Sequence, residues 1–364
     1  MEFLYETIAA VTWQQVIMWC LGALLIFLAI KKDMEPALLL PMGFGAILIN
    51  IPFSGAEGVM SSLFAIGIEM NEIMPLVLFI GIGAMIDFGP LLSNPKLFLF
   101  GGAAQFGIFL TILLAAACGF SIEDAASIGI IGAADGPTSI VVAQTLKSNY
   151  VGPIMVVAYS YMALVPIIQP AVIKLTTTKK ERLIRMEYKP ASVSKRTKIL
   201  FPIFVTIVSG LIAPASLSLV GMLMFGNLIR ECGVLNYLTD TAKDVLTNLV
   251  TLFLGITIAF TMKAENFITV QTLMIMGLGL CAFIFDTFSG VMLAKVMNLF
   301  LKEKINPMIG AAGISAFPMS ARIVQKMGIK EDPTNHLLMH AVGANVSGQI
   351  ASAIVGGLII GLVL

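Results

Sequence analysis

The sequence predicts an all-α protein that crosses a membrane many times and is built from two inverted repeats. Three observations lead to this prediction. Of the 364 residues, 58% are hydrophobic and only 12% are charged, which is about half the charged fraction of a soluble domain. Apolar runs of transmembrane length recur along the chain. Two further apolar stretches, one in each half, are interrupted by small and polar residues.

Ten apolar runs are expected to span the membrane, five in each half. They are residues 13–30, 37–52, 75–92, 97–120 and 153–173, then 199–213, 217–229, 249–260, 268–293 and 337–364. Several are short for a hydrocarbon core about 30 Å thick. The interrupted stretches are residues 126–145 and 307–324. We expect each of these to be a re-entrant element made of broken helices.

The charge distribution divides the chain into three parts. Residues 174–198 hold nine basic and two acidic residues, and the positive-inside bias places this linker in the cytoplasm. It separates a first repeat, residues 1–173, from a second, residues 199–364. The loops alternate correctly between the two sides of the membrane only if each interrupted stretch leaves the membrane on the side from which it entered. Each half then has five spans plus one re-entrant element, the two halves are oppositely oriented, and both termini lie outside.

Short words repeat in the same order in the two halves. Leu78–Ile82 reads LFIGI and Leu252–Ile256 reads LFLGI, while IGAA at Ile131–Ala134 recurs at Ile309–Ala312. Each repeat follows about 180 residues after its first copy, which supports internal duplication. Inverted repeats whose broken helices meet in mid-membrane are typical of secondary transporters.

Asp135 is the clearest candidate for an ion-binding residue. It lies in the middle of the first interrupted stretch, where Gly136 and Pro137 break the helix and free backbone carbonyls. A carboxylate beside free carbonyls and the hydroxyls of Thr138 and Ser139 suits a small cation. The alternative is a helix cap, with the carboxylate satisfying backbone amides.

The second interrupted stretch supplies matching neutral oxygens. Asn306 and Ser315 are candidate ligands, and Gly310 allows close approach of the backbone. Arg322 follows about two helical turns after Ser315. Its guanidinium suits a carboxylate, although a positive-inside anchor would explain it equally simply.

Other polar residues lie within apolar runs. Tyr161 could donate a hydrogen bond or a proton, or it could simply pack at the interface. Asn345, Ser347 and Gln349 in the last span could line a pathway or hold helices together. Asp286 is a further membrane carboxylate whose role the sequence leaves open, as it does for Asp87.

Several motifs resemble one protein family. The segments GIIGAADGPTSI, AYSYMALVPIIQP, TTTKKERLIRM, KINPMIGAAGISAFPMSARIVQK and LLMHAVGANVSGQI are similar to the beta subunit of the sodium ion-translocating, biotin-dependent decarboxylases. That family serves oxaloacetate, methylmalonyl-CoA and glutaconyl-CoA decarboxylases. The resemblance extends from about Pro75 to Gly357. One small departure is Ala134, which stands directly before the aspartate of the first motif.

The resemblance implies a mechanism and a set of partners. A carboxyltransferase subunit moves a carboxyl group onto biotin held by a carrier subunit, and the carboxybiotin docks on the beta subunit from the cytoplasm. Its decarboxylation consumes a proton and drives sodium outward. The resemblance also implies a small gamma or delta membrane subunit, a homo-oligomer of beta subunits and a bacterial or archaeal cytoplasmic (inner) membrane. The residues at the family's functional positions are Asp135, Asn306, Gly310 and Ser315 for sodium, and Tyr161 and Arg322 for catalysis.

We expect an enzyme subunit, a carboxybiotin decarboxylase coupled to sodium export, with sodium as the ion and biotin on a partner chain. The alternative is a stand-alone secondary transporter that exchanges sodium for a proton or a carboxylate. Arg322 and the basic linker favour docking of an anionic group from a partner. A net charge of +1 gives no reason to expect nucleic acid, and no Walker motif supports nucleotide-driven pumping. The acyl substrate is not encoded here, because another subunit selects it.

Overall fold

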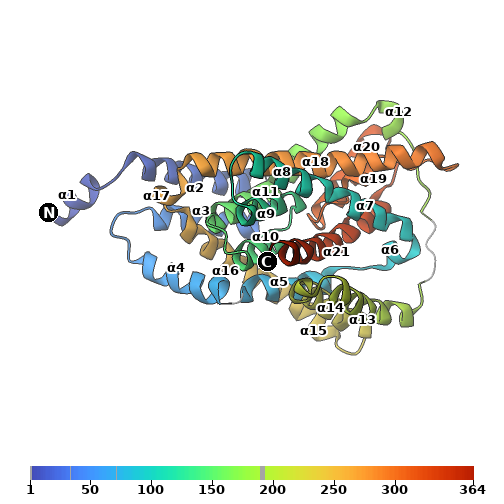
Figure 1. The fold of residues 1–364 in the computed structure, drawn as a ribbon, viewed down its shortest axis with the longest axis horizontal. Coiled ribbons are helices and arrows are strands. Elements are labelled where there is room, and N and C mark those ends of the chain that lie inside the picture. The colour runs from blue at the N-terminus through green and yellow to red at the C-terminus, as the bar shows by residue number, and fades with distance from the viewer. Residues whose placement is uncertain (1, 33, 71, 189–192) are drawn as a thin grey trace.

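The computed structural model describes residues 2–32, 34–70, 72–188 and 193–364, with side chains from residue 6 onward. These residues form helices and contain no strand (Figure 1). The helices are α1 (Glu2–Ala9), α2 (Trp13–Lys32), α3 (Pro36–Ile49), α4 (Ala56–Phe64), α5 (Ile73–Met85), α6 (Gly89–Ser93), α7 (Phe98–Ala104), α8 (Phe106–Ala117), α9 (Ile122–Gly129), α10 (Gly136–Thr145), α11 (Val151–Thr176), α12 (Lys179–Arg182), α13 (Lys195–Ile212), α14 (Leu217–Cys232), α15 (Asn236–Asp240), α16 (Thr247–Ala259), α17 (Ala264–Phe267), α18 (Val270–Phe300), α19 (Met308–Ala311), α20 (Met319–Glu331) and α21 (Leu338–Val363).

The prediction of an all-α polytopic membrane protein is confirmed. Within the described residues, six helical stretches are long and apolar enough to cross a bilayer, and a bent pair, Ala56–Glu69 with Ile73–Met85, would make a seventh. The six are Trp13–Lys32, Pro95–Ala117, Val151–Thr176, Asn236–Met262, Val270–Phe300 and Leu338–Val363. Predicted spans 37–52, 199–213 and 217–229 form the shorter helices α3, α13 and α14. The inverted orientation of the halves and the division at the linker stay predictions.

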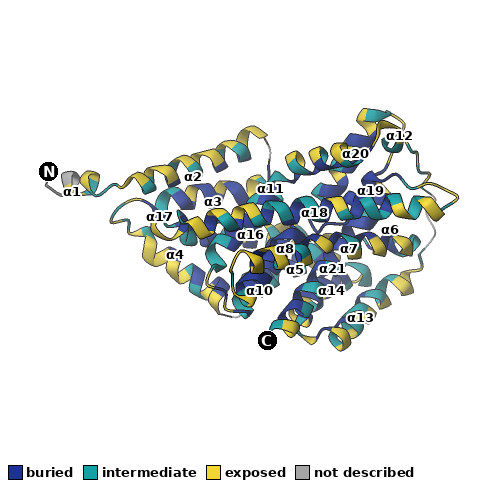
Figure 2. Cartoon of the chain, turned by 45° about the horizontal axis from the view of Figure 1, so that its top comes forward, coloured by how far each residue is buried: buried dark blue, intermediate teal, exposed yellow. Residues whose placement is uncertain are grey.

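Burial follows the pattern expected of a protein surrounded by lipid. Figure 2 shows exposed residues along α2, α4 and α13, and a buried centre around α8, α10 and α21. Many of the exposed side chains are large and apolar, including Phe27 on α2 and Leu211 on α13. The buried centre instead holds many polar side chains. Polar groups are therefore kept away from the lipid-facing surface, as a hydrocarbon environment requires.

Both interrupted stretches are broken helices, as expected. After α9 the chain makes a 3₁₀ turn at Ile130–Ala133 and then takes a left-handed conformation at Ala134 (φ 53°), before α10 begins. In the second half, α19 ends at Ala311 and α20 begins only at Met319. The two breaks touch, because the Ser315 amide donates a hydrogen bond to the Ala133 carbonyl at 3.0 Å.

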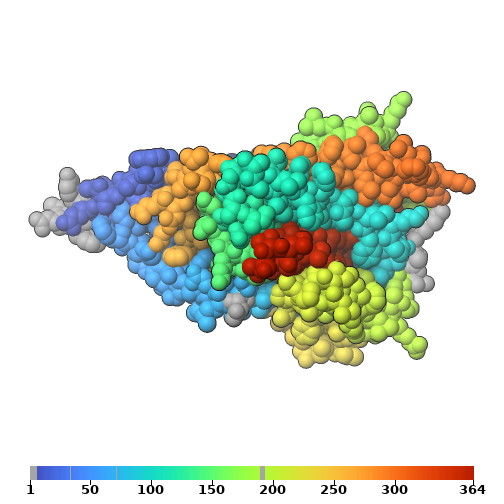
Figure 3. Space-filling view, in the orientation of Figure 1, coloured from blue at the N-terminus to red at the C-terminus, as the bar shows by residue number. Residues whose placement is uncertain are grey.

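Helix backbones touch directly around the second break. A Cβ atom added to Gly310 would lie 2.0 Å from the carbonyl oxygen of Gly290 on α18, and one added to Gly348 on α21 would lie 2.0 Å from that of Gly313. Small residues allow this close approach between membrane helices. The second break is therefore held between α18 and α21. In Figure 3, the end of α21 lies between the surface of α7 and α8 and that of α14.

Gly310→Ala should destabilise the protein by about 1–3 kcal/mol, because the added methyl group forces α18 and α19 apart. Gly277→Ala is the matched control, since a Cβ at Gly277 on α18 meets no atom within 4 Å. The melting temperature of the purified protein in detergent measures the effect. Equal melting temperatures for the two variants would show that the Gly290–Gly310 contact is not required.

Candidate functional site

The centre of the site is the Asp135 carboxylate, which stands at the N-terminus of α10 and is only 3% exposed. One of its oxygens, Oδ2, accepts three hydrogen bonds. The donors are Thr138 Oγ1 at 2.7 Å, Gln349 Nε2 at 3.1 Å and Ser352 Oγ at 3.2 Å. The carboxylate is therefore surrounded by side chains from α10 and α21.

Ser315 reaches Asp135 through Ser352. Its Oγ lies 2.6 Å from Ser352 Oγ and 2.9 Å from the Gly348 carbonyl oxygen. A hydroxyl has one proton to donate, so a consistent arrangement has Ser315 donating to Ser352 and Ser352 donating to Asp135. The two residues predicted from opposite halves are thus brought together, with an intermediate residue that the sequence analysis did not identify.

Two more polar groups border this site. On α21, Asn345 Nδ2 donates to the Ile314 carbonyl at 2.6 Å, and its buried Oδ1 has no hydrogen-bond partner in the described part of the chain. On α11, the ring of Tyr159 packs against Gly136, where an added Cβ would lie 2.2 Å from it. The Tyr159 hydroxyl is also buried without a described partner.

α21 supplies one face of polar residues to the site. Asn345, Gln349 and Ser352 are spaced four and three residues apart, which places them on the same side of a helix. Asn345 and Gln349 join α21 to the two breaks, through the Ile314 carbonyl and through Asp135, and a role in lining a pathway stays a prediction. Ser347 has a different role, because its Oγ bonds the Leu97 carbonyl and the Gly101 amide and so joins α21 to α7. The only sequence signal for Ser352 was its place three residues after Gln349.

The chemistry of these groups suits a small hard cation. Asp135 supplies one negative charge, and serine, threonine and amide oxygens supply neutral ligands. Broken helices present such oxygens to sodium ions in transporters. No group of three or more His, Cys, Asp or Glu side chains among the described residues could hold a metal ion.

Tyr161 lies on another side of α11 from Tyr159. Its hydroxyl donates to the Met276 carbonyl on α18 at 2.5 Å, and its side chain lines an apolar cavity of about 210 Å³ with Ser160 and Met276 among the lining residues. The structure therefore does not bring Tyr161 into the hydrogen-bond network of Asp135. The tyrosine that packs beside Asp135 is Tyr159.

Asn306 and Gly310 also lie apart from the Asp135 network. The Asn306 Nδ2 group donates to the carbonyls of Arg182 and Ile184, each at 2.8 Å, and its Oδ1 accepts from the Met308 amide at 3.1 Å. Asn306 thus anchors the basic linker to the start of the second break. Gly310 is required for the backbone contact with α18 described above.

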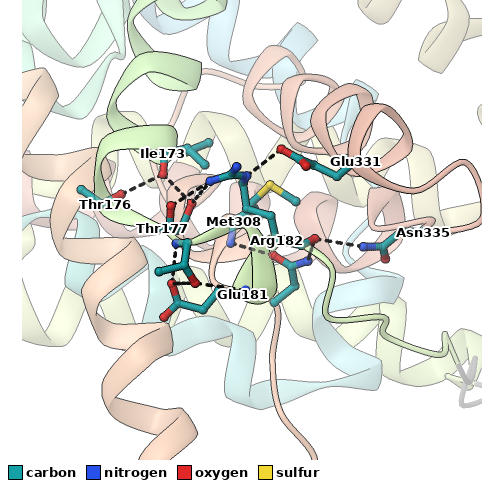
Figure 4. Close-up of polar contacts among 10 residues, drawn as sticks. Ile173, Thr176, Thr177, Glu181, Arg182, Met308, Glu331 and Asn335 are labelled. Atoms are coloured by element: carbon teal, nitrogen blue, oxygen red, sulfur yellow. Dashed lines mark hydrogen bonds and ion pairs between the residues drawn. The ribbon is translucent and has the colours of Figure 1, made fainter.

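Ion pairs strengthen this attachment of the linker, which we call the linker clamp (Figure 4). Arg182 Nε lies 2.7 Å from Glu331 Oε1, and Lys295 Nζ lies 3.1 Å from Glu181 Oε1. Asn335 Nδ2 contacts the Arg182 carbonyl at 3.3 Å. The linker clamp therefore joins α12 to the ends of α18 and α20.

A third pair, Arg185 Nε with Asp332 Oδ2 at 2.7 Å, extends the linker clamp. Hydrogen bonds from the Thr334 amide and hydroxyl, together with Arg185, lower the pKa of Asp332 below its usual value. This carboxylate is therefore ionised near neutral pH.

Arg322 lies in the first turn of α20 and is exposed. Its guanidinium makes no hydrogen bond or ion pair with the residues that the structure describes. It is therefore accessible to an anion from outside the chain, and its position also fits a membrane-surface anchor.

Asp286, on α18, is a fully buried carboxylate outside the Asp135 network. It lies against Gly107 of α8 and Gly132 of the first break, where a Cβ atom on either glycine would come within 2.4 Å of a carboxylate oxygen. The amides of Gly107 and Ile108 face it, but neither oxygen has a hydrogen bond of normal geometry with a described residue. Its signal in the sequence is that acidic residues are rare in apolar runs.

The chain is similar to one family of known proteins. Residues 14–363 match the family model described as the Na⁺-transporting oxaloacetate decarboxylase beta subunit. The chain is 50% identical to a methylmalonyl-CoA decarboxylase subunit beta of Propionigenium modestum, over 95% of this chain and 94% of that protein. It is 48% identical to a glutaconyl-CoA decarboxylase subunit beta of Acidaminococcus fermentans, over 97% and 94%.

A third relative carries a different substrate name. The chain is 43% identical to an oxaloacetate decarboxylase beta chain of Klebsiella pneumoniae, over 96% of this chain and 95% of that one. All three relatives are thus matched over nearly their full lengths. The chain belongs to the family of beta subunits of the Na⁺-transporting decarboxylases, and it is the multi-pass membrane subunit of a sodium-pumping, biotin-dependent decarboxylase.

Proposed function

We propose that this subunit decarboxylates carboxybiotin presented by a carrier subunit and uses the reaction to move sodium outward across a bacterial or archaeal cytoplasmic membrane. In this step the bond between the ureido nitrogen and the carboxylate carbon breaks, and carbon dioxide leaves. The nitrogen keeps the electron pair and takes up a proton. The observation that supports the sodium path best is the chain of contacts from Ser315 through Ser352 to Asp135.

In this proposal sodium binds at the Asp135 carboxylate. A cation there would take the place of hydroxyl protons, so Thr138 and Ser352 would turn their oxygen lone pairs toward it. Asn345 Oδ1, which is buried without a described partner, is a further candidate ligand. Asn306 and Gly310 would then act on sodium indirectly, by positioning the break that carries Ser315.

The catalytic roles are proposed from the family pattern. Arg322 would hold the carboxylate of carboxybiotin, because its guanidinium stays protonated at any working pH. Tyr161 would donate the proton. Its hydroxyl now bonds the Met276 carbonyl, so donation requires that this hydrogen bond opens.

The proposed partners are a carboxyltransferase subunit, a biotin-carrier subunit, a small gamma or delta membrane subunit and further copies of this chain. The relatives are named for three different substrates, which supports selection of the substrate by another subunit. A stand-alone sodium/proton or sodium/carboxylate transporter would need no carrier, and none of these relatives is named as one.

Asp135→Asn should abolish sodium transport and sodium-dependent decarboxylation. The substitution keeps the size of the side chain but removes the one negative charge that offsets a cation in a low-dielectric interior. Sodium uptake into proteoliposomes and the decarboxylation rate of the purified complex are the measurements. Asp240→Asn, at an exposed ion pair with Lys243, is the control. Normal sodium-dependent turnover by Asp135→Asn would rule out the proposed site.

Ser315→Ala should raise the sodium concentration for half-maximal rate by roughly two- to tenfold, since one hydrogen-bonding oxygen contributes about 0.5–1.5 kcal/mol. Ser352→Ala should have the larger effect, because Ser352 contacts Asp135 directly. Ser62→Ala, whose hydroxyl donates to the Gly58 carbonyl within its own helix α4, should change nothing. If Ser352→Ala kept the normal sodium dependence, the path through Ser352 would be wrong.

Arg322→Lys should weaken the use of carboxybiotin more than the binding of sodium. Lysine keeps the charge but loses the two-pronged hydrogen bonding of guanidinium. The decarboxylation rate is measured against carrier concentration and, separately, against sodium concentration. A change confined to the sodium dependence would assign Arg322 to the ion path.

A further inference from the structure

A large polar cleft opens beside the linker clamp, at the end of the molecule where α6, α12 and the end of α18 lie (Figure 1). Its volume is about 870 Å³, within the range of small-molecule sites. One wall is the start of the linker, residues 184–187, and another is the connection between α18 and α19, residues 301–305. The described residues that line it include neither Arg322 nor a member of the Asp135 network.

Three membrane-spanning stretches begin or end at this cleft. Lys96 lies at the start of the stretch that contains α7 and α8, Lys302 follows the last residue of α18 by two positions, and His340 is the third residue of α21. All three side chains line the cleft. Basic side chains at the ends of spans reach the level of the lipid head groups. The cleft is therefore placed at the surface of the membrane.

Exposed apolar side chains continue from the cleft along the neighbouring spans. Leu299 and Phe300, the last two residues of α18, are largely exposed, and Leu99 on α7 is half exposed. They lie within three residues of Lys302 and Lys96 in the sequence. A basic pocket at the end of a span, next to an apolar surface, suits a phospholipid, which carries its phosphate and its acyl chains in one molecule.

The cleft carries more positive than negative charge. It is lined by the basic residues Lys96, Arg185, Lys302 and Lys304 and by the acidic residues Glu187 and Glu303. Lys96 and Lys302 are exposed and have no ion-pair partner in the described part of the chain. A concave surface with uncompensated positive charge attracts anions. Because Arg185 already pairs with Asp332, these two lysines are the groups available to hold one.

His340 adds a hydrogen-bonding group to the buried side of the cleft. It is 8% exposed, and its ring packs edge-on against Tyr188 with ring centroids 5.6 Å apart. Its Nε2 has no hydrogen-bond partner among the described residues. Buried polar atoms are rarely left unpaired, and both nitrogens of a protonated imidazole donate. A phosphate oxygen in the cleft would therefore be a suitable partner for Nε2.

We infer that this cleft binds the phosphate group of an anionic phospholipid, with the acyl chains along the exposed apolar end of α18. A phosphate carries negative charge and several acceptor oxygens, so it can pair with Lys96, Lys302 and His340 together. A soluble phosphate compound shares this chemistry but would make no use of Leu299 and Phe300. The cleft is separate from Arg322 and Asp135, so a lipid can bind there whether or not those residues act as proposed.

A lipid in this cleft would contact the linker and the second break together. Residues 184–187 form one wall, and Asn306, which directly follows the other wall, bonds the carbonyls of Arg182 and Ile184. The lipid would therefore support the linker clamp from the membrane side. On the proposed function, loss of the lipid should loosen the break that carries Ser315 and lower the rate of sodium-dependent decarboxylation.

Phosphatidylglycerol titrated against the purified full-length protein in detergent tests this site, with bound lipid counted by native mass spectrometry. Lys96→Gln/Lys302→Gln should lower the affinity roughly 30-fold, as expected for two basic groups at a membrane surface, and should leave the binding of phosphatidylcholine unchanged. His340→Phe keeps an aromatic ring against Tyr188 but cannot donate a hydrogen bond, so it should also weaken phosphatidylglycerol binding. Lys326→Gln/Lys330→Gln, at exposed positions of α20 outside the cleft, is the matched control.

Equal phosphatidylglycerol binding by the unmodified protein and both cleft variants would overturn the inference. An equal loss in the control pair would do the same, since it would mean general attraction to surface charge. Displacement of the lipid by inorganic phosphate, at an ionic strength matched with potassium chloride, would assign the cleft to a soluble phosphate compound instead. Failure of sodium-dependent decarboxylation in the unmodified complex would overturn only the proposed function, because lipid binding is measured without turnover.

Discussion

The structure depends on how the chain satisfies its backbone where two helices break inside the membrane. A free amide or carbonyl in hydrocarbon costs several kcal/mol, so each break needs partners from the protein. The breaks supply one another, since the Ser315 amide bonds the Ala133 carbonyl. Asn345 bonds the Ile314 carbonyl from α21, and the Ser139 hydroxyl bonds the Asp135 carbonyl. These groups lie next to the side chains that surround the Asp135 carboxylate, since Ser139 follows Thr138 and Ser315 contacts Ser352.

The linker clamp connects the second break to the basic linker, which the positive-inside bias predicts to lie in the cytoplasm. Arg182 and Asn306 join the linker to both ends of the region that carries Ser315, through Glu331 on α20 and through the segment before α19. The backbone contact of Gly310 with Gly290 makes that region continuous with α18. A partner that moved the linker would therefore act on the break through a short series of direct contacts. Coupling of this kind needs an element with two arrangements, and a broken helix is well suited to provide one.

The sequence predicted the fold class, both breaks and the proximity of Asp135 to Ser315, which contact one another only through Ser352, because glycine, proline and charge in apolar runs are strong local signals. It did not predict Ser352, since a serine among small residues in a membrane helix usually indicates helix packing. It placed Asn306 beside the ion, because nothing local shows that its amide would meet the carbonyls of Arg182 and Ile184 more than 100 residues earlier. The choice between Tyr159 and Tyr161 depends on the rotation of α11 about its axis, which only packing against α10 and α18 determines.

The linker clamp has a consequence for the ion that this protein transports. Arg185 and Asp332 pair at the surface, with 67% of the arginine side chain exposed, and attraction between such charges is screened over about 10 Å in 0.1 M salt. If sodium binds at Asp135 as proposed, sodium chloride acts in two ways, as the transported ion at that site and as an electrolyte around the linker. Potassium or choline salts at equal ionic strength would produce only the second effect. The transported ion thus also acts as an electrolyte, which weakens the ion pair that helps to attach the linker.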